Sequence, residues 1–360
     1  MNVLASLIVI CILCVITGLQ HLQKGQKKNN KDQVDKKERH ISQDIGTSSI
    51  HKLNTTLDYD TFLCDLFEKH KLLFFKEENS FIKPIEYALE GGKRIRPKIA
   101  LDICNSVSNG QRNCGLSSLS IEYIHVSSLI IDDLPCMDNA LIRRKKECLH
   151  IKFNEAVAQL ASVMLMSMAL NAISIDLHNR CINGEMSFEE SHKIGMFFLN
   201  NFSETIGHNG ASGGQLIDLE TAGKIKEENM GEKLKEISLS HSVETIIKRK
   251  TGTFFETSFL LGWLIGGGSF EKINIIKKVA NDFAMVFQIT DDLEDLEEDK
   301  NSNTKNVSQN YAIRYSIEKA VRDAKEYLRM FKQEMKLLEL FSPFIKELCK
   351  LMEKRIHKDF

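Results

Sequence analysis

The chain has 360 residues, and its 48 Lys and Arg against 49 Asp and Glu give a formal net charge of −1. This balance excludes the basic footprint of a dedicated nucleic-acid binder, and 42% hydrophobic with 27% charged residues excludes wholesale disorder. Only four prolines favour long uninterrupted helices, because proline breaks the helical hydrogen-bond ladder.

The N-terminal residues 1–22 contain no Lys, Arg, Asp or Glu, and Val3 to Leu19 is almost continuously apolar. As a helix these residues would span roughly 25 Å, enough for a bilayer core of about 30 Å once flanking residues help. A cleaved signal peptide is the alternative, but it requires positive charge before the apolar run. Here seven basic residues follow the run, between Lys24 and Arg39. The positive-inside rule then predicts a single-pass anchor with the bulk of the chain in the cytosol.

Residues 23–55 read as a polar tether, and residues 56–360 as one large helical domain. Stretches such as 155–175 and 273–290 carry Ala, Leu, Met and Ile at spacings of three and four. No run of alternating β-branched residues with hairpin turns demands a sheet. The sequence therefore predicts an all-α fold, a large single-domain helical bundle.

Two aspartate clusters carry the chemistry, and each follows an apolar segment. Asp132, Asp133 and Asp138 form the first; Asp132 and Asp138 converge only if the helix ends near Pro135 and the chain turns. The second cluster comprises Asp291, Asp292 and Asp295. Oxygen ligands without His or Cys suit a hard cation such as Mg²⁺, which favours one or two carboxylates plus phosphate oxygens. The alternative is that each cluster is a solvated helix end.

Basic residues supply possible phosphate donors in two further stretches. One is Gly91-Gly92-Lys93-Arg94-Ile95-Arg96, where the glycine pair lets the backbone approach an anion. The other is Lys250-Thr251-Gly252. His125 lies seven residues before Asp132, on nearly the same helix face, although a satisfied core histidine is the plainer interpretation.

Five motifs in one order resemble the trans-isoprenyl diphosphate synthases over residues 60–320. They are GGKRIRP (91–97), IHVSSLIIDDLPCMDN (124–139) with Arg143-Arg144, GGQLIDL (213–219), KTG (250–252) and FQITDDLED (287–295). The apolar N-terminus with residues 262–280 and 310–312 is most similar to membrane-anchored family members of asfarvirus-type large DNA viruses. A host-cell membrane is the expected location if the chain is viral.

The resemblance implies an all-α isoprenoid synthase bundle that binds two or three Mg²⁺ ions per site and works as a homodimer. Its implied reaction condenses isopentenyl diphosphate with dimethylallyl, geranyl or farnesyl diphosphate. The implied metal ligands are Asp132, Asp133, Asp138, Asp291, Asp292 and Asp295. The implied contacts of the allylic diphosphate are Arg143, Lys250, Thr251, Gln288 and Lys305, and those of isopentenyl diphosphate are Lys93, Arg96, His125 and Arg144. Asp132, Asp133 and Lys250 are the expected catalytic residues.

The residues one turn before Asp132 act as the floor of the product cavity in this family. Here they are Ser127 and Ser128, both small, so we expect geranylgeranyl diphosphate or longer products. A farnesyl diphosphate synthase is the alternative product class. A terpene cyclase, a non-catalytic partner subunit and a membrane-tethered scaffold are the other functions considered. The cyclase would not need Lys93, Arg96 and His125, and partner subunits commonly lose one aspartate cluster.

Several positions depart from the family pattern. Asn139, Ala140 and Leu141 stand where acidic residues are frequent, and Lys145 replaces a common glycine. Asn310 replaces a usual aspartate, and residues 311–315 lack the expected Gly-Lys. These differences affect the outer metal and phosphate contacts but leave the six principal aspartates in place.

Overall fold

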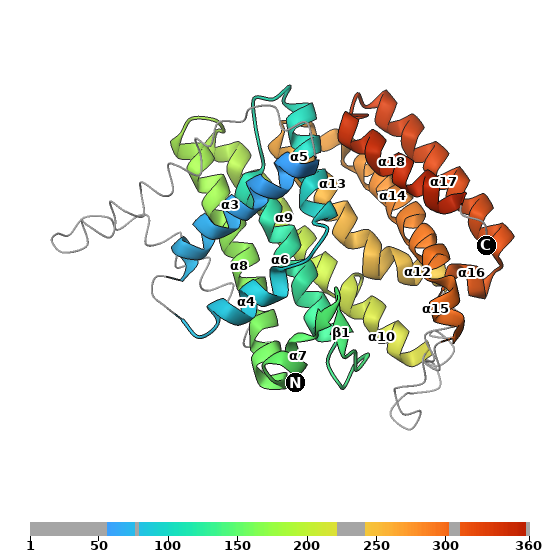
Figure 1. Cartoon of the computed structure of the whole chain (residues 1–360). Coiled ribbons are helices and arrows are strands. Elements are labelled where there is room, and N and C mark those ends of the chain that lie inside the picture. Colours follow the sequence, from blue (N-terminus) through green and yellow to red (C-terminus); the bar gives the residue numbers. More distant parts are fainter. Residues whose placement is uncertain (1–55, 76–78, 222–241, 302–309, 358–360) are drawn as a thin grey trace.

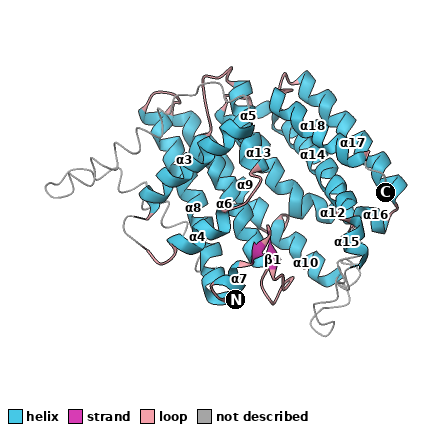
Figure 2. Cartoon of the chain, viewed as in Figure 1, coloured by secondary structure: helices cyan, strands magenta, loops and turns pink. Residues whose placement is uncertain are grey.

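Helices account for nearly all regular structure in the computed structural model, which describes residues 56–75, 79–221, 242–301 and 310–357 (Figures 1 and 2). The predicted anchor, the tether and Lys305 lie outside these described residues. The helices of the N-terminal half are α3 (Thr56–Phe74), α4 (Ile82–Leu89), α5 (Ile95–Val107), α6 (Gly115–Asp132), α7 (Leu149–Lys152), α8 (Glu155–Ile182), α9 (Phe188–Ile206) and α10 (Ala211–Thr221).

The C-terminal half is also helical. Its elements are α12 (Val243–Ile247), the π-helical turn η2 (Lys248–Gly252), α13 (Thr253–Ile265), the 3₁₀ turn η3 (Phe270–Lys272), α14 (Ile273–Glu294), α15 (Leu296–Asn301), α16 (Tyr311–Arg314), α17 (Ile317–Leu337) and α18 (Pro343–Ile356). Within the described ranges, the helical prediction is confirmed except for one antiparallel hairpin. It pairs β1 (Ile142–Arg143) with β2 (Lys146–Glu147) and appears in magenta in Figure 2.

The long helices α6 and α8 run antiparallel and form one side of the bundle. Ser117 donates to Asp176 near one end of the pair, and Ser127 contacts Ser162 near the other. Alanines at 158, 161, 169 and 172 of α8 are fully buried, so the two backbones approach closely. This packing fixes the end of α6, where the first aspartate cluster begins.

Helix α13 lies in the middle of the bundle, between the α6–α8 side and the layer made by α14, α17 and α18 (Figure 1). Most of its residues are apolar and buried, as expected of a helix in the middle of a bundle. Phe255 and Phe259 of α13 stack edge-on or tilted against Phe283 of α14, with ring centroids 4.9 and 5.8 Å apart. These rings hold α14, and with it the second aspartate cluster, beside η2.

Helix α17 covers the outside of α14. Its buried residues Ala320, Ala324, Leu328, Phe331 and Met335 recur every three or four positions, and charged residues occupy its other face. This apolar stripe packs on α14, so α17 closes the core while its polar face meets solvent.

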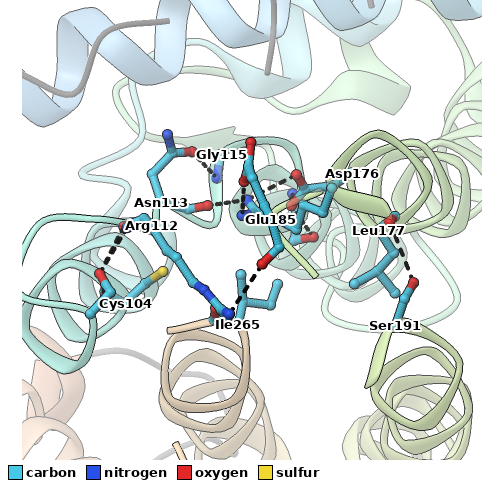
Figure 3. Close-up of polar contacts among 12 residues, drawn as sticks. Cys104, Arg112, Asn113, Gly115, Asp176, Leu177, Glu185, Ser191 and Ile265 are labelled. Atoms are coloured by element: carbon cyan, nitrogen blue, oxygen red, sulfur yellow. Dashed lines mark hydrogen bonds and ion pairs between the residues drawn. The ribbon is translucent and has the colours of Figure 1, made fainter. Parts of the chain in front are cut away.

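The end of the bundle opposite Asp132 is closed by polar contacts around the connection before α6 (Figure 3). The guanidinium of Arg112 donates to the carbonyl oxygens of Glu185 and Ile265, at 3.1 and 3.3 Å, and pairs with Glu190 at 3.2 Å. One side chain thereby ties three helix ends together. These contacts are structural, since they lie at the far end of α6 from both aspartate clusters.

The buried His70 should make folding stability depend on pH. Its ring contacts the Tyr123 hydroxyl at 2.9 Å and the Asn171 amide oxygen at 3.1 Å, and burial lowers its pKa from 6.5 to about 4. The unfolded chain therefore binds the proton more tightly, so this contribution to stability is complete above pH 6.5 and is lost as the pH falls toward 4. The predicted loss is about 3 kcal/mol. Urea unfolding from pH 7 to 4 should show this slope in the wild type but not in His70→Gln; equal slopes would contradict the prediction.

Candidate active site

The first aspartate cluster lies where α6 ends and the chain turns back. The backbone N–H of Asp138 donates to the carbonyl oxygen of Asp132 at 2.9 Å, directly after the helix ends. The turn brings Asp132 and Asp138 together, so the condition that the sequence set for their convergence is met. Burial raises the pKa of Asp132 to about 6, and Asp138 adds to this rise while Lys250 opposes it.

Asp133 forms an ion pair with a different basic residue from the one that most affects the pKa of Asp132. It is buried, and its carboxylate accepts from Nε of Arg143 at 2.6 Å. Burial raises its pKa, and Arg143 opposes the rise. Two predicted site residues thus neutralise each other, and their ion pair holds the β1–β2 hairpin against the end of α6.

The turn η2 places a lysine against the first cluster. Lys250 forms an ion pair with Asp218 of α10, and Asp132 and Asp138 are also close enough to raise its pKa. Burial alone would lower this pKa, so the surrounding carboxylates outweigh desolvation. Gly214 is needed here, because a Cβ at that position would lie 2.8 Å from Cγ of Lys250. Such π-helical turns are frequent at functional sites.

The same turn contacts the second cluster through its next residue. The Thr251 hydroxyl donates to Oε1 of Gln288 at 2.9 Å, and the Gln288 amide donates to Asp292 at 2.8 Å. Lys250 and Thr251 are adjacent in the chain. The turn η2 therefore lies near both aspartate clusters. Three of the five residues implied as allylic diphosphate contacts, namely Lys250, Thr251 and Gln288, therefore lie together.

The second cluster lies at the end of α14, and its members differ in their surroundings. Burial raises the pKa of Asp292 to about 7, although Gln288 and the backbone N–H of Tyr311 donate to its carboxylate. Asn310 donates to the carbonyl oxygen of Asp292 at 2.7 Å and to Asp299 at 2.8 Å. The asparagine that departs from the family pattern therefore positions Asp292. Asp295 is exposed and directly follows the helix.

Asp291 pairs with a residue from the C-terminal helix. Its Oδ1 lies 3.1 Å from Nη1 of Arg355, whose Nη2 lies 2.6 Å from Glu294. Asp291 is also close enough to Arg96 to raise the pKa of that guanidinium, although burial has the larger, opposite effect. The second cluster is therefore near the basic residues that follow the glycine pair.

The basic group brings together three of the four side chains implied for isopentenyl diphosphate. Nη1 of Arg96 lies 3.2 Å from Nε2 of His125, and Arg144 pairs with Glu122 at 3.6 Å. The Arg144 guanidinium fills the space beside Gly92, where a Cβ would lie 2.7 Å from it. Lys93 is exposed, at the edge of this group. Burial and the nearby Arg96 hold the pKa of His125 well below its usual value, so the imidazole is neutral.

Buried polar atoms without a partner make this basic group suited to binding an anion. Nε of Arg96 and Nη1 of Arg144 are buried, and neither has a hydrogen-bond partner among the described residues. An unpaired buried donor costs about 1–3 kcal/mol, and an anion that accepted both N–H groups would remove that cost.

The aspartate clusters fit Mg²⁺ in their donor chemistry. Among the described residues, no three His, Cys, Asp or Glu side chains are already arranged around one point. Mg²⁺ does not need such a cage, because it keeps several waters and uses one or two carboxylates plus phosphate oxygens. Asp132 and Asp138 at the end of α6, and Asp291 at the end of α14, supply oxygen donors of this kind.

Sequence reasoning assigned no role to three residues of this site. Asp218 holds Lys250, Glu122 faces Arg144, and Arg355 pairs with Asp291. The signal for Asp218 was present, since it stands in the GGQLIDL motif three residues after Gln215. Glu122 was detectable as the one acidic residue within the apolar α6 before Asp132. No local pattern marks Arg355.

Comparison with known proteins agrees with this geometry. The sequence model of the polyprenyl synthetase family matches residues 78–349. The chain belongs to the polyprenyl synthetase family. The family is the one that the five motifs resemble, so that prediction is confirmed.

Relatives in this family include plant and viral proteins. A heterodimeric geranylgeranyl pyrophosphate synthase large subunit of Arabidopsis thaliana is 32% identical over 260 residues, 70% of this chain and 63% of that protein. The chain thus spans just under two thirds of that relative. The trans-prenyltransferase of African swine fever virus is 30% identical over 260 residues, 70% of this chain and 69% of the viral protein.

A solved structure shares the fold of this polyprenyl synthetase family member. A geranyltransferase from Legionella pneumophila superposes with a TM-score of 0.62 at 22% identity, covering 84% of this chain and 99% of that one. This likeness establishes the isoprenoid synthase fold of the described helices.

Proposed function

We propose that this chain is a Mg²⁺-dependent prenyl diphosphate synthase that adds isopentenyl diphosphate to allylic diphosphates. The observation that carries the proposal is the turn η2. Its Lys250 pairs with Asp218 and is influenced by the charges of Asp132 and Asp138, and its Thr251 reaches Asp292 of the second cluster through Gln288. An anion site formed by Arg96, His125 and Arg144 stands near Asp291. The cationic side chains could bind two diphosphates, and the carboxylates could bind the metal ions that neutralise them.

Each group of side chains has a distinct role in the proposed reaction. Lys250, Thr251 and Gln288 orient the allylic diphosphate, while Arg96 and Arg144 bind isopentenyl diphosphate. Bound Mg²⁺ would neutralise the charge that develops on the departing diphosphate. The surrounding apolar helices exclude water from the allylic cation. Neutral His125 donates or accepts one hydrogen bond without adding charge, and the released pyrophosphate takes the proton lost from the product.

Radiolabelled isopentenyl diphosphate tests this function directly. We expect incorporation with dimethylallyl, geranyl and farnesyl diphosphate in the presence of Mg²⁺, and none after chelation with EDTA. A terpene cyclase would instead release hydrocarbon from the allylic diphosphate alone. A partner subunit or a scaffold would incorporate no label with any starter at saturating Mg²⁺, and that result would refute the proposal.

Geranylgeranyl diphosphate is the proposed product, and Ser128 is the residue at which to test it. Ser128 is half-buried, and its hydroxyl donates to the carbonyl oxygen of His125. Ser127 is instead fully buried against Ser162 of α8, at 3.0 and 2.8 Å, so a bulky side chain there would disturb the α6–α8 contact.

We expect Ser128→Phe to shift the main product from twenty to fifteen carbons, because a packed interior cannot yield the volume of another isoprene unit without strain. Ser127→Ala is the matched control and should leave product length unchanged. Chromatography of dephosphorylated products measures both. A wild type that releases mainly farnesyl diphosphate, or a Phe variant with unchanged products, would show that the floor lies elsewhere.

A homodimer through α8 is the proposed assembly. By length and composition α8 alone among the described helices could cross a membrane, but its inner face is buried in the bundle. Its outer face leaves Leu160 54% and Val163 40% exposed. A second copy of this surface would cover these side chains. Sedimentation should show a dimer for the wild type and a monomer for Leu160→Glu; a monomeric wild type would contradict this.

The membrane anchor stays a proposal that rests on the sequence of residues 1–22 and the basic residues after them. We propose that the enzyme domain lies on the cytosolic side, where it would deliver an apolar product close to the bilayer. Alkaline carbonate should leave the full chain in the membrane fraction and release a chain that lacks residues 1–22. Release of the full chain would refute the anchor.

A further inference from the structure

The guanidinium of Arg355 forms an ion pair with Asp291 of the second aspartate cluster. Its side chain is 8% exposed, and it reaches from α18 to Asp291 at 3.1 Å and Glu294 at 2.6 Å. Asp291 and Glu294 are three residues apart on α14 and therefore share a helix face. Their charges would repel if nothing cationic lay between them, and Arg355 supplies that cation.

Arg355 donates to Asp291 and pairs with Glu294, but its set of hydrogen bonds is incomplete. Its Nε is buried, and no partner for it lies among the described residues. An unsatisfied buried N–H is unfavourable, which makes this ion pair easier to open than a fully bonded one. Only Oδ1 of Asp291 is engaged by Arg355. Asp291 is thus neutralised by a group that can be displaced.

We propose that Arg355 is an internal counter-cation of the second cluster, which keeps Asp291 from binding a metal ion until a diphosphate arrives with it. This inference rests on the proposed function, in which Asp291 is a metal ligand. With Arg355 in place, the Asp291–Glu294 pair carries a net charge of −1 rather than −2. A divalent ion alone then binds Asp291 only weakly, because the positive charge of Arg355 beside the carboxylate repels it. A diphosphate adds negative charge and restores the attraction.

Metal binding measured without turnover tests this proposal. The probe is Mn²⁺, titrated calorimetrically into the full chain in detergent, first alone and then with inorganic pyrophosphate. Arg355→Gln should bind Mn²⁺ about tenfold more tightly than the wild type in the absence of pyrophosphate, because one repelling charge is gone. Pyrophosphate should then improve its affinity less than it improves that of the wild type. Arg355→Lys keeps the cation and should resemble the wild type.

A second variant makes the test independent of how well Arg355→Gln folds. Asp291→Asn should leave the wild-type affinity for Mn²⁺ alone within about twofold, since Arg355 already occupies that carboxylate. With pyrophosphate present, the same substitution should weaken Mn²⁺ binding. Arg329→Gln, at an exposed ion pair on α17, is the matched arginine control and should change neither titration.

Two results would overturn the proposal. One is unchanged or weaker Mn²⁺ binding by folded Arg355→Gln; the other is a tenfold loss of Mn²⁺ affinity in Asp291→Asn without pyrophosphate. Failure of the proposed function is a separate outcome. A chain that incorporates no isopentenyl diphosphate would fail that assay and could still show both Arg355 effects.

Discussion

Asp132→Asn should lower kcat/KM for condensation roughly a thousandfold at saturating Mg²⁺, with little loss of helical structure. The substitution keeps the size of the side chain but removes a carboxylate that lies at the end of α6 beside Asp138 and Lys250. It therefore removes a proposed metal ligand, and fewer carboxylates are left to balance the charge of Lys250. Initial rates with radiolabelled isopentenyl diphosphate give the kinetic result, and circular dichroism reports the fold.

Asp65→Asn is the matched control. Asp65 pairs with Lys69 on the exposed side of α3, a contact of the kind that contributes little to stability. Its variant should keep wild-type turnover. If Asp132→Asn were equally active, the first cluster would be only a solvated helix end, the alternative that its sequence left open.

The sequence predicted the parts of this site that depend on local chain geometry. An apolar run followed by a proline indicated that the helix before Asp132 would end there, and the chain does turn at that point. The KTG motif indicated possible phosphate donors, and the structure places its residues on the turn η2. In both cases the informative residues are neighbours in the chain, so their spacing fixes where their side chains lie.

The sequence could not predict contacts made by packing between distant helices. Asp291 and Arg355 are separated by the whole of α15, α16 and α17, and their pairing follows from how α18 rests on α14. Asp133 looked equivalent to Asp132, yet Arg143 of the hairpin forms an ion pair with Asp133, while the nearby charge that most affects the pKa of Asp132 is Lys250. The short strands of that hairpin were also missed, since two residues each are too few to show alternation.

The surroundings of η2 explain how one lysine can balance two aspartates of the first cluster together with Asp218. Asp132, Asp138 and Asp218 come from α6, the following turn and α10, and each raises the pKa of Lys250. Lys250 remains protonated although it is largely buried, because several carboxylates compensate for its lost hydration. The same ammonium group is then available to bind the anionic substrate between α6 and α10.

Lys250→Met should therefore lower kcat roughly a hundredfold or more, because the variant keeps the length of the side chain but loses the charge that stabilises the departing diphosphate. Lys250→Arg should recover part of the loss, since it restores the charge with a different shape. Lys248→Met, at an exposed lysine of the same turn, is the control and should keep wild-type turnover. Single-turnover rates separate this chemical step from product release. An unchanged chemical rate in Lys250→Met would mean that the lysine only holds Asp218 in place.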